Sequence, residues 1–256
     1  MKLRLLLSSV AVLALGLGGS AASAAAPAAG SCSGGPIAAG VYNSLVVTGT
    51  CTIKAAVTVS GNVTVADGAY LDAAYLGTKL TIGGNVSVGK GAKLGLGCTF
   101  GYHDCGVVPV WAGNVNVSGN VVANNALTMF IDFTTIHGNV VSNGGGDITM
   151  VDHPPAEDGL VLPIKDDVIG GNLTVQGWQG AWFGIIRDTV GGNVIASNIV
   201  GTRIGEQNEP DSTEIVTNRI SGNLICQGNT PVAQIGDSGG SPNQVGGRKI
   251  GECAGL

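Results

Sequence analysis

The chain contains few charged and few aromatic residues. Asp, Glu, Lys and Arg make up 11% of its 256 residues, and Phe, Trp and Tyr make up 4%. The core must therefore be built from Val, Ile, Leu and Ala rather than from large rings. Basic residues are scattered and are outnumbered by acidic residues, 12 to 17. This balance argues against a nucleic acid or an anionic membrane as partner.

Long apolar runs are also missing. The longest, residues 5–17, is too short to span a bilayer and follows the basic residues Lys2 and Arg4. The Ala-Ser-Ala sequence at 22–24 is a plausible cleavage signal, so residues 1–24 are predicted to be a signal peptide. The protein is therefore expected to be secreted and extracellular. Its mature form would carry ten basic and seventeen acidic residues, a net charge of −7.

Six cysteines are present, and their spacing is not that of a zinc site. In an exported chain they are expected to form disulfides. They fall into three sequential groups, so pairing between neighbours is the simplest connectivity, although the sequence leaves others open. The simplest pairs are Cys32 with Cys51, Cys98 with Cys105, and Cys226 with Cys253.

Glycine is abundant and opens a repeated phrase. Gly-Asn is followed by Val or Leu and, two positions later, usually by a second apolar residue, as in GNVTV at Gly61. The phrase returns at Gly84, Gly113, Gly138, Gly171, Gly192 and Gly222. An eighth Gly-Asn, at Gly119, lies too close to Gly113 to begin its own unit. The alternation predicts a strand with one buried face, and Gly-Asn predicts a turn before it.

Successive phrases are 23, 29, 25, 33, 21 and 30 residues apart. This period, with short strands and no helical pattern, predicts an all-β solenoid. Over residues 45–225 the repeat resembles the single-stranded right-handed parallel β-helix of secreted bacterial, pectin-lyase-like proteins, here with about seven coils. The resemblance implies that the seven Asn residues of the phrases stack in a ladder along the axis. An antiparallel sandwich with Gly-Asn hairpin turns is the alternative.

The ends of a solenoid expose unpaired strand edges, which need covering. One cysteine pair precedes the first phrase and another follows the last, so disulfides are expected to staple both ends. The predicted organisation is a signal peptide at 1–24, an N-terminal cap at 25–52, a β-helix repeat domain at 53–225 and a C-terminal cap at 226–256.

The stretch QIGDSGGSPN at 234–243 contains the Gly-Asp-Ser-Gly-Gly sequence in which trypsin-like proteases present their nucleophilic serine. His103, in GYHDCG, does not match the histidine context of that family. Only 18 residues follow Ser238, too few to complete a protease barrel. A hydroxyl without a positioned base is a weak nucleophile. Ser238 is therefore predicted to be a turn residue, and no catalytic residue is assigned.

Many β-helix proteins cleave polysaccharides, so a polysaccharide lyase or glycoside hydrolase is the alternative function. Polygalacturonase-like enzymes carry an Asp-Asp pair before a Gly-His-Gly, whereas here Asp166 and Asp167 follow His137. Candidate calcium and base residues of a lyase, such as Asp132 and Arg187, fall at different offsets from their glycines. A non-enzymatic structural or glycan-binding surface protein is therefore predicted.

The second, fourth and sixth intervals are the long ones, and their extra residues begin 13 or 14 positions after the glycine. Insertions at one offset of a solenoid emerge on one face. These insertions hold ten of the seventeen acidic residues, which predicts an acidic loop face for Ca²⁺, a basic partner, or an extracellular or cell-wall polysaccharide. An ordinary solvated face is the alternative. The candidate binding residues are His103, Asp104, Asp152, His153, Glu157, Asp158, Asp166, Asp167, Glu206, Glu209, Asp211 and Glu214.

Overall fold

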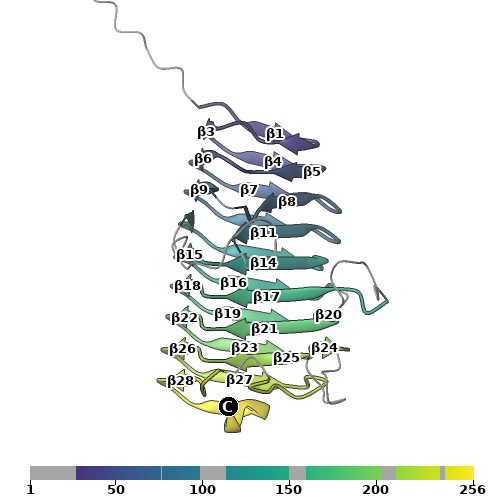
Figure 1. Ribbon diagram of the computed structural model, residues 1–256, viewed down its shortest axis with the longest axis vertical. Helices are drawn as coiled ribbons and strands as arrows, with labels where there is room; N and C mark the ends of the chain where they lie inside the picture. Colours follow the sequence, from purple (N-terminus) through teal and green to yellow (C-terminus); the bar gives the residue numbers. More distant parts are fainter. Residues whose placement is uncertain (1–26, 76, 99–113, 150–159, 203–211, 237–239) are drawn as a thin grey trace, which may run out of the picture.

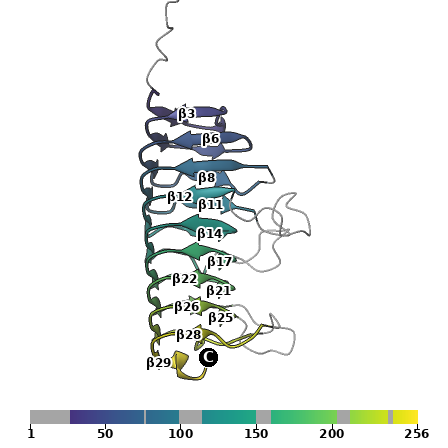
Figure 2. The same ribbon diagram turned by 90° about the vertical axis from the view of Figure 1, so that its left-hand side faces the viewer.

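A computed structural model describes residues 27–75, 77–98, 114–149, 160–202, 212–236 and 240–256. Three long sheets contain nearly all of its strands, and every strand pair in these sheets is parallel (Figure 1). The three sheets are called A, B and C, and their strands are given below. Consecutive strands of the chain belong to sheets A, B and C in turn, and the next strand returns to sheet A one level further along the axis (Figure 2). The predicted all-β parallel solenoid is thus confirmed, and the antiparallel sandwich is wrong for the described residues.

The strands are short. Sheet A consists of β1 (Gly30–Cys32), β4 (Leu45–Val47), β7 (Val63–Val65), β10 (Val86–Val88), β13 (Val121–Asn124), β16 (Val140–Asn143), β19 (Leu173–Gln176), β23 (Val194–Ser197), β27 (Leu224–Gln227) and β29 (Lys249–Gly251). Sheet B consists of β2 (Gly35–Pro36), β5 (Thr50–Thr52), β8 (Tyr70–Ala73), β11 (Lys93–Gly97), β14 (Thr128–Asp132), β17 (Val161–Lys165), β21 (Trp182–Ile186) and β25 (Thr213–Val216).

Sheet C runs alongside. It consists of β3 (Gly40–Tyr42), β6 (Ala56–Val59), β9 (Lys79–Ile82), β12 (Val115–Val117), β15 (Thr134–Ile136), β18 (Val168–Ile169), β22 (Thr189–Val190), β26 (Arg219–Ile220) and β28 (Gln244–Val245). A small pair, β20 (Gln179–Gly180) and β24 (Val200–Gly201), and a 3-10 turn, η1 (Glu252–Gly255), complete the described elements. No helix among the described residues is long and apolar enough to cross a membrane.

The repeated phrase marks the strands of sheet A, with one exception. Gly-Asn precedes β7, β10, β16, β19, β23 and β27 as predicted, but Gly113 precedes β12 of sheet C. The strand of sheet A in that coil, β13, follows Gly119, which the spacing argument had set aside. The reason is that a coil can be short: Asn120 and its partner in the next coil, Asn139, are only 19 residues apart.

The predicted asparagine ladder is present, with Asn120 in the place expected for Asn114. In each step a backbone N–H donates to Oδ1 of the asparagine one coil earlier, at 2.8 Å. From Asn120 onward the side-chain Nδ2 donates to the same oxygen, at 2.9–3.3 Å. The ladder consists of Asn62, Asn85, Asn120, Asn139, Asn172, Asn193 and Asn223. It ties seven coils together on the side of sheet A.

Both ends of the solenoid are stapled as predicted. Cys32 is bonded to Cys51, and Cys226 is bonded to Cys253. Cys105 lies outside the described residues, so its pairing with Cys98 stays a prediction. The sheets themselves extend into both segments expected to be caps, because β1 to β5 and β28 to β29 continue the parallel ladders. The sequence hid the first coils because Asn43 is followed by Ser44 and has no Gly before it.

Candidate functional site: a charged corner between sheets B and C

Most of the predicted acidic face lies outside the described residues. This applies to His103, Asp104, Asp152, His153, Glu157, Asp158, Glu206, Glu209 and Asp211, and also to Ser238. The flanking strands nevertheless show where each insertion interrupts its coil. Residues 99–113 lie between strands of sheets B and C, whereas residues 150–159 and 203–211 lie between strands of sheets A and B.

The three insertions thus share an offset from glycine but not a corner of the coil, and their common acidic face stays a prediction. Counting forward from glycine assumes that every coil passes from sheet A to sheet B in the same number of residues. The coil after Gly84 makes this passage in four residues, 89–92, and reaches sheet B before its insertion. The coil after Gly138 has residues 144–149 there, followed by the insertion.

The three remaining candidates belong to the solenoid body. Asp166 follows β17 at the corner towards sheet C, and Asp167 beside it is only 1% exposed. Glu214 lies within β25 and is 2% exposed. The prediction that Asp167 and Glu214 lie on an exposed loop is thus wrong, because residues 161–165 and 213–216 form strands of sheet B and are not part of the insertions.

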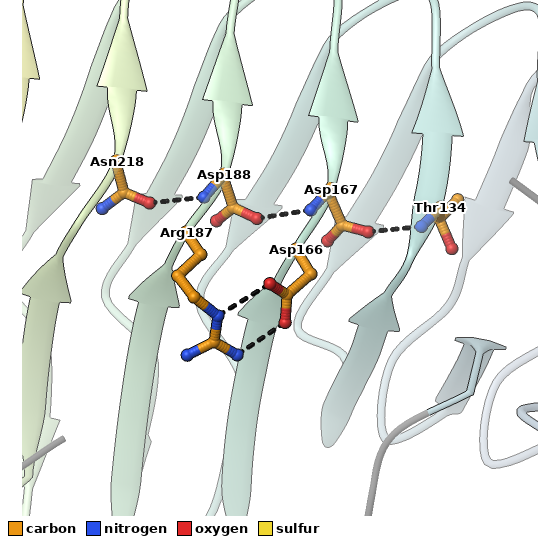
Figure 3. Close-up of polar contacts among 6 residues, drawn as sticks. All are labelled: Thr134, Asp166, Asp167, Arg187, Asp188 and Asn218. Carbon is orange, nitrogen blue, oxygen red and sulfur yellow. Dashed lines mark hydrogen bonds and ion pairs between the residues drawn. The ribbon is translucent and has the colours of Figure 1, made fainter. Parts of the chain in front are cut away.

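The corner from sheet B to sheet C has the same backbone shape in successive coils. The first residue after the strand is left-handed, with φ of 50° at Phe133, 57° at Asp166, 61° at Arg187 and 60° at Thr217. Left-handed backbone is uncommon for non-glycine residues and persists where the surrounding structure holds it. The next residue in each of these coils is hydrogen-bonded along the stack, as Figure 3 shows from Thr134 to Asn218.

These next residues form a second polar ladder, which we call the corner ladder: Thr134, Asp167, Asp188, Asn218 and Asn243. Each backbone N–H donates to Oδ1 of the member one coil later. The distances are 2.7 Å from Thr134 to Asp167, 2.8 Å from Asp167 to Asp188, 2.8 Å from Asp188 to Asn218 and 3.1 Å from Asn218 to Asn243. The four side chains that accept these bonds are buried.

An ion pair lies on the solvent side of this ladder. Arg187 donates from Nε to Oδ1 of Asp166 at 2.7 Å and from Nη2 to Oδ2 at 2.5 Å. The side chains are 48% and 19% exposed, respectively. This bidentate geometry raises the pKa of Arg187 above its ordinary range. Figure 3 shows the two side chains pointing toward each other from neighbouring corners.

Two further charged groups are the last residues of two neighbouring strands of sheet B. Asp132 and Lys165 are register partners on β14 and β17, and the Lys165 ammonium lies 4.7 Å from the centre of the Trp182 ring. Burial, and then the charge of Asp166, raises the pKa of Asp132 to about 8. Burial lowers the pKa of Lys165. Asp132 is only 3% exposed, so its carboxyl group has little access to solvent, whereas Lys165 is half-buried.

The corner does not form a metal site. Both carboxylate oxygens of Asp166 are occupied by Arg187, and Oδ1 of Asp167 accepts the N–H of Thr134. Within the described ranges, no group of three or more His, Cys, Asp or Glu residues is placed to hold a metal ion. Calcium binding by the insertions therefore stays a prediction that involves neither aspartate.

A simple signal for the corner ladder was available in the sequence. Asp167, Asp188, Asn218 and Asn243 each lie four residues before a glycine that starts the next coil, as does Thr134. Counted forward from the preceding glycine, these residues lie at different offsets, because the insertions lie in between. Counting backward from the following glycine aligns them, because residues from the corner through sheet C are never interrupted in these coils.

No family model, curated protein or solved structure matches the chain. The assignment as a parallel β-solenoid therefore rests on the sheets and ladders of the chain itself. Membership of the pectin-lyase-like family stays a prediction.

Proposed function

We propose that the protein is a secreted, non-enzymatic solenoid that binds a linear extracellular polysaccharide along the outer face of sheet C. The two disulfides support an oxidising compartment, in which such pairs persist. The sequence at residues 1–24 supports export. The observation that carries the proposal is a continuous row of outward side chains on sheet C.

The row follows the strand register from coil to coil. It consists of Val41, Thr58, Thr81, Asn116, Thr135, Val168, Thr189, Arg219 and Gln244. Only Asn116 and Thr135 are half-buried, and the others are exposed. Seven of these nine side chains, all but Val41 and Val168, carry hydrogen-bonding groups, and neighbours are about 4.8 Å apart along the axis.

This geometry suits a polymer of sugars better than a small ligand. A small ligand is normally held in a concave pocket that buries most of its surface. The row is instead straight, and it offers hydroxyl and amide groups that both donate and accept hydrogen bonds. A linear polysaccharide presents hydroxyls of the same kind at regular intervals, so many weak contacts can act together.

The test is co-sedimentation of the mature protein with insoluble cellulose, chitin and bacterial cell-wall polysaccharide. Thr81, Thr135 and Thr189 are changed together to Val, which keeps the shape and removes the hydroxyls. Each lost hydrogen bond costs roughly 0.5–1.5 kcal/mol, so binding is expected to weaken by about tenfold or more.

The matched control carries Thr64→Val and Thr174→Val on the outer face of sheet A, where the same change should leave binding intact. Failure of the wild-type protein to sediment with any of the three polymers would contradict the proposal. Equal loss of binding in both variants would assign it to another surface.

Cleavage of an acidic polysaccharide is the second candidate. The raised pKa of Asp132 beside the lowered pKa of Lys165 gives a protonated acid next to a more easily deprotonated amine, a combination suited to proton transfer. Because Asp132 is buried, we expect no unsaturated sugars when the protein is incubated with pectin or alginate. Their release by the wild type, and its loss in Asp132→Asn, would favour the lyase instead.

A further inference from the structure

The corner ladder changes its chemistry along the axis. In its last two coils the members are asparagines, and each uses both ends of its amide. Asn218 accepts through Oδ1 and donates from Nδ2 to the main-chain oxygen of Ile185 at 2.8 Å. Asn243 accepts in the same way and donates to the oxygen of Ile215 at 2.7 Å. Each asparagine thus satisfies one donor and one acceptor of the preceding coil.

Asp188 and Asp167 occupy the same place in the two coils before. Their Oδ1 atoms accept the backbone N–H of the preceding coil, as the asparagine Oδ1 atoms do. Their Oδ2 atoms, which stand where the asparagines carry Nδ2, are buried and have no hydrogen-bond partner. A donor is therefore missing at each of these two positions.

The strand register identifies the group that faces each Oδ2. Ile164 is paired with Ile185. The main-chain oxygen of Ile164 therefore has the same position relative to Asp188 as the main-chain oxygen of Ile185 has relative to Asn218. Ile131 is paired with Ile164 and stands in the same relation to Asp167. A carboxylate oxygen and a carbonyl oxygen are both acceptors and repel each other, whereas a protonated carboxyl can donate as an amide does.

We propose that Asp167 and Asp188 are protonated in the folded protein and donate from Oδ2 to the main-chain oxygens of Ile131 and Ile164. Two protons then close the ladder in these coils, and loss of either proton to solvent opens it. The solenoid thereby contains a pH-sensitive section next to a section that is closed by the neutral amides of Asn218 and Asn243.

The surrounding charges act in the same direction. Burial raises the pKa of both Asp167 and Asp188 well above the ordinary value, and the neighbouring carboxylates raise it further. The charged groups that face the pair are Asp132 from β14, Asp166 from the corner after β17, and Arg187 from the corner after β21. Arg187 lowers the pKa of Asp188, but its guanidinium is held outward by Asp166.

The sign of the pH dependence follows. A carboxyl whose folded pKa is raised stabilises the protein fully below its unfolded pKa, about 4 for aspartate. That stabilisation is lost as the pH rises towards and through the folded pKa. The melting temperature of the wild type is therefore expected to fall from about pH 4 upward. Asp132 contributes in the same sense up to about pH 8.

Thermal melts of the full mature chain between pH 4 and pH 9 test the proposal. The double variant Asp167→Asn/Asp188→Asn carries an amide donor at both positions at every pH in this range. At pH 8 it is expected to melt at least about 4 °C above the wild type, with a flatter pH profile and little difference at pH 4. The matched reverse variant, Asn218→Asp, is expected to melt lower at pH 8 and to steepen the profile.

Infrared spectroscopy provides a second readout that does not depend on stability. The wild type at pH 7 should show the carbonyl absorption of buried protonated carboxyls, and the double variant should lose the larger part of it, leaving that of Asp132. A double variant that melts below the wild type at pH 8, or a wild type without that absorption, would overturn the proposal. If the double variant does not fold, the reverse variant and the wild-type spectrum decide.

Discussion

Replacing Gly192 with alanine is expected to destabilise the solenoid by about 3 kcal/mol, because a Cβ at this position has no room. It would lie 2.4 Å from Oδ1 of Asn172 and 2.8 Å from the main-chain oxygen of Gly171, both in the preceding coil. Equivalent contacts recur at Gly84, Gly138 and Gly222. The repeated glycine therefore reflects the close approach of stacked turns, and the following asparagine makes the hydrogen bonds of that approach.

Urea denaturation of the mature protein measures this effect. The control is Gly34→Ala, because a Cβ there would meet nothing closer than 3.9 Å and the residue has no left-handed backbone. We expect the control to change the free energy of unfolding by less than about 1 kcal/mol. Equal effects at the two positions would show that stacked turns tolerate a side chain, contrary to the structure.

Trp178→Ala is expected to lower the free energy of unfolding by about 3–5 kcal/mol. The ring is fully buried, and its Nε1 donates to the main-chain oxygen of Leu127 at 3.1 Å. Leu127 lies two coils earlier, so the indole bridges the intervening coil, which contains residues 150–159 between sheets A and B. Removing the ring would leave a cavity in the hydrophobic core that these coils share.

Trp178→Phe separates the two contributions at this position. It keeps most of the apolar volume and leaves the Leu127 oxygen without its donor, so a loss of about 1–3 kcal/mol is expected. If Trp178→Ala lowered the free energy of unfolding no more than Trp178→Phe does, the packing of the ring would contribute nothing. The stabilisation by Trp178 would then come from its hydrogen bond alone.

The repeat was readable from the sequence because one face is buried in each sheet A strand that follows the phrase. Apolar residues two apart after Gly-Asn therefore predicted all seven strands that follow the phrases, six of them in sheet A, together with the parallel stacking. Gly119 was missed because it lies only six residues after Gly113, whose phrase begins a strand of sheet C. The first coils were missed because they lack the glycine of the phrase.

Counting backward from glycine locates the corner ladder, but its hydrogen bonding could not be read from the sequence in the same way. Aspartate and asparagine at one position look interchangeable in a sequence, and both are common in turns. Only the burial of Asp167 and Asp188, and the direction of the hydrogen bonds from the coil before, distinguish a closed corner from an acidic loop. The residues of sheet B were hidden for a related reason, since β14 and β21 are buried on both faces and do not alternate.

The row proposed to bind polysaccharide requires Asn116 to lie on sheet C, next to Thr81. The repeated phrase GNVNV at Gly113 predicts something else, because alignment with GNVSV at Gly84 would place Asn116 beside Ser87 on sheet A. Neighbouring positions on parallel strands are close enough for a disulfide, whereas positions on different sheets are not. The two arrangements can therefore be separated by cross-linking.

The measurement is peptide mapping by mass spectrometry after mild oxidation of two folded double-cysteine variants. The structure predicts a cross-link in Thr81→Cys/Asn116→Cys and none in Ser87→Cys/Asn116→Cys. The reverse result, a cross-link to position 87 and none to position 81, would contradict the order of the strands in the solenoid and remove the continuous face on sheet C.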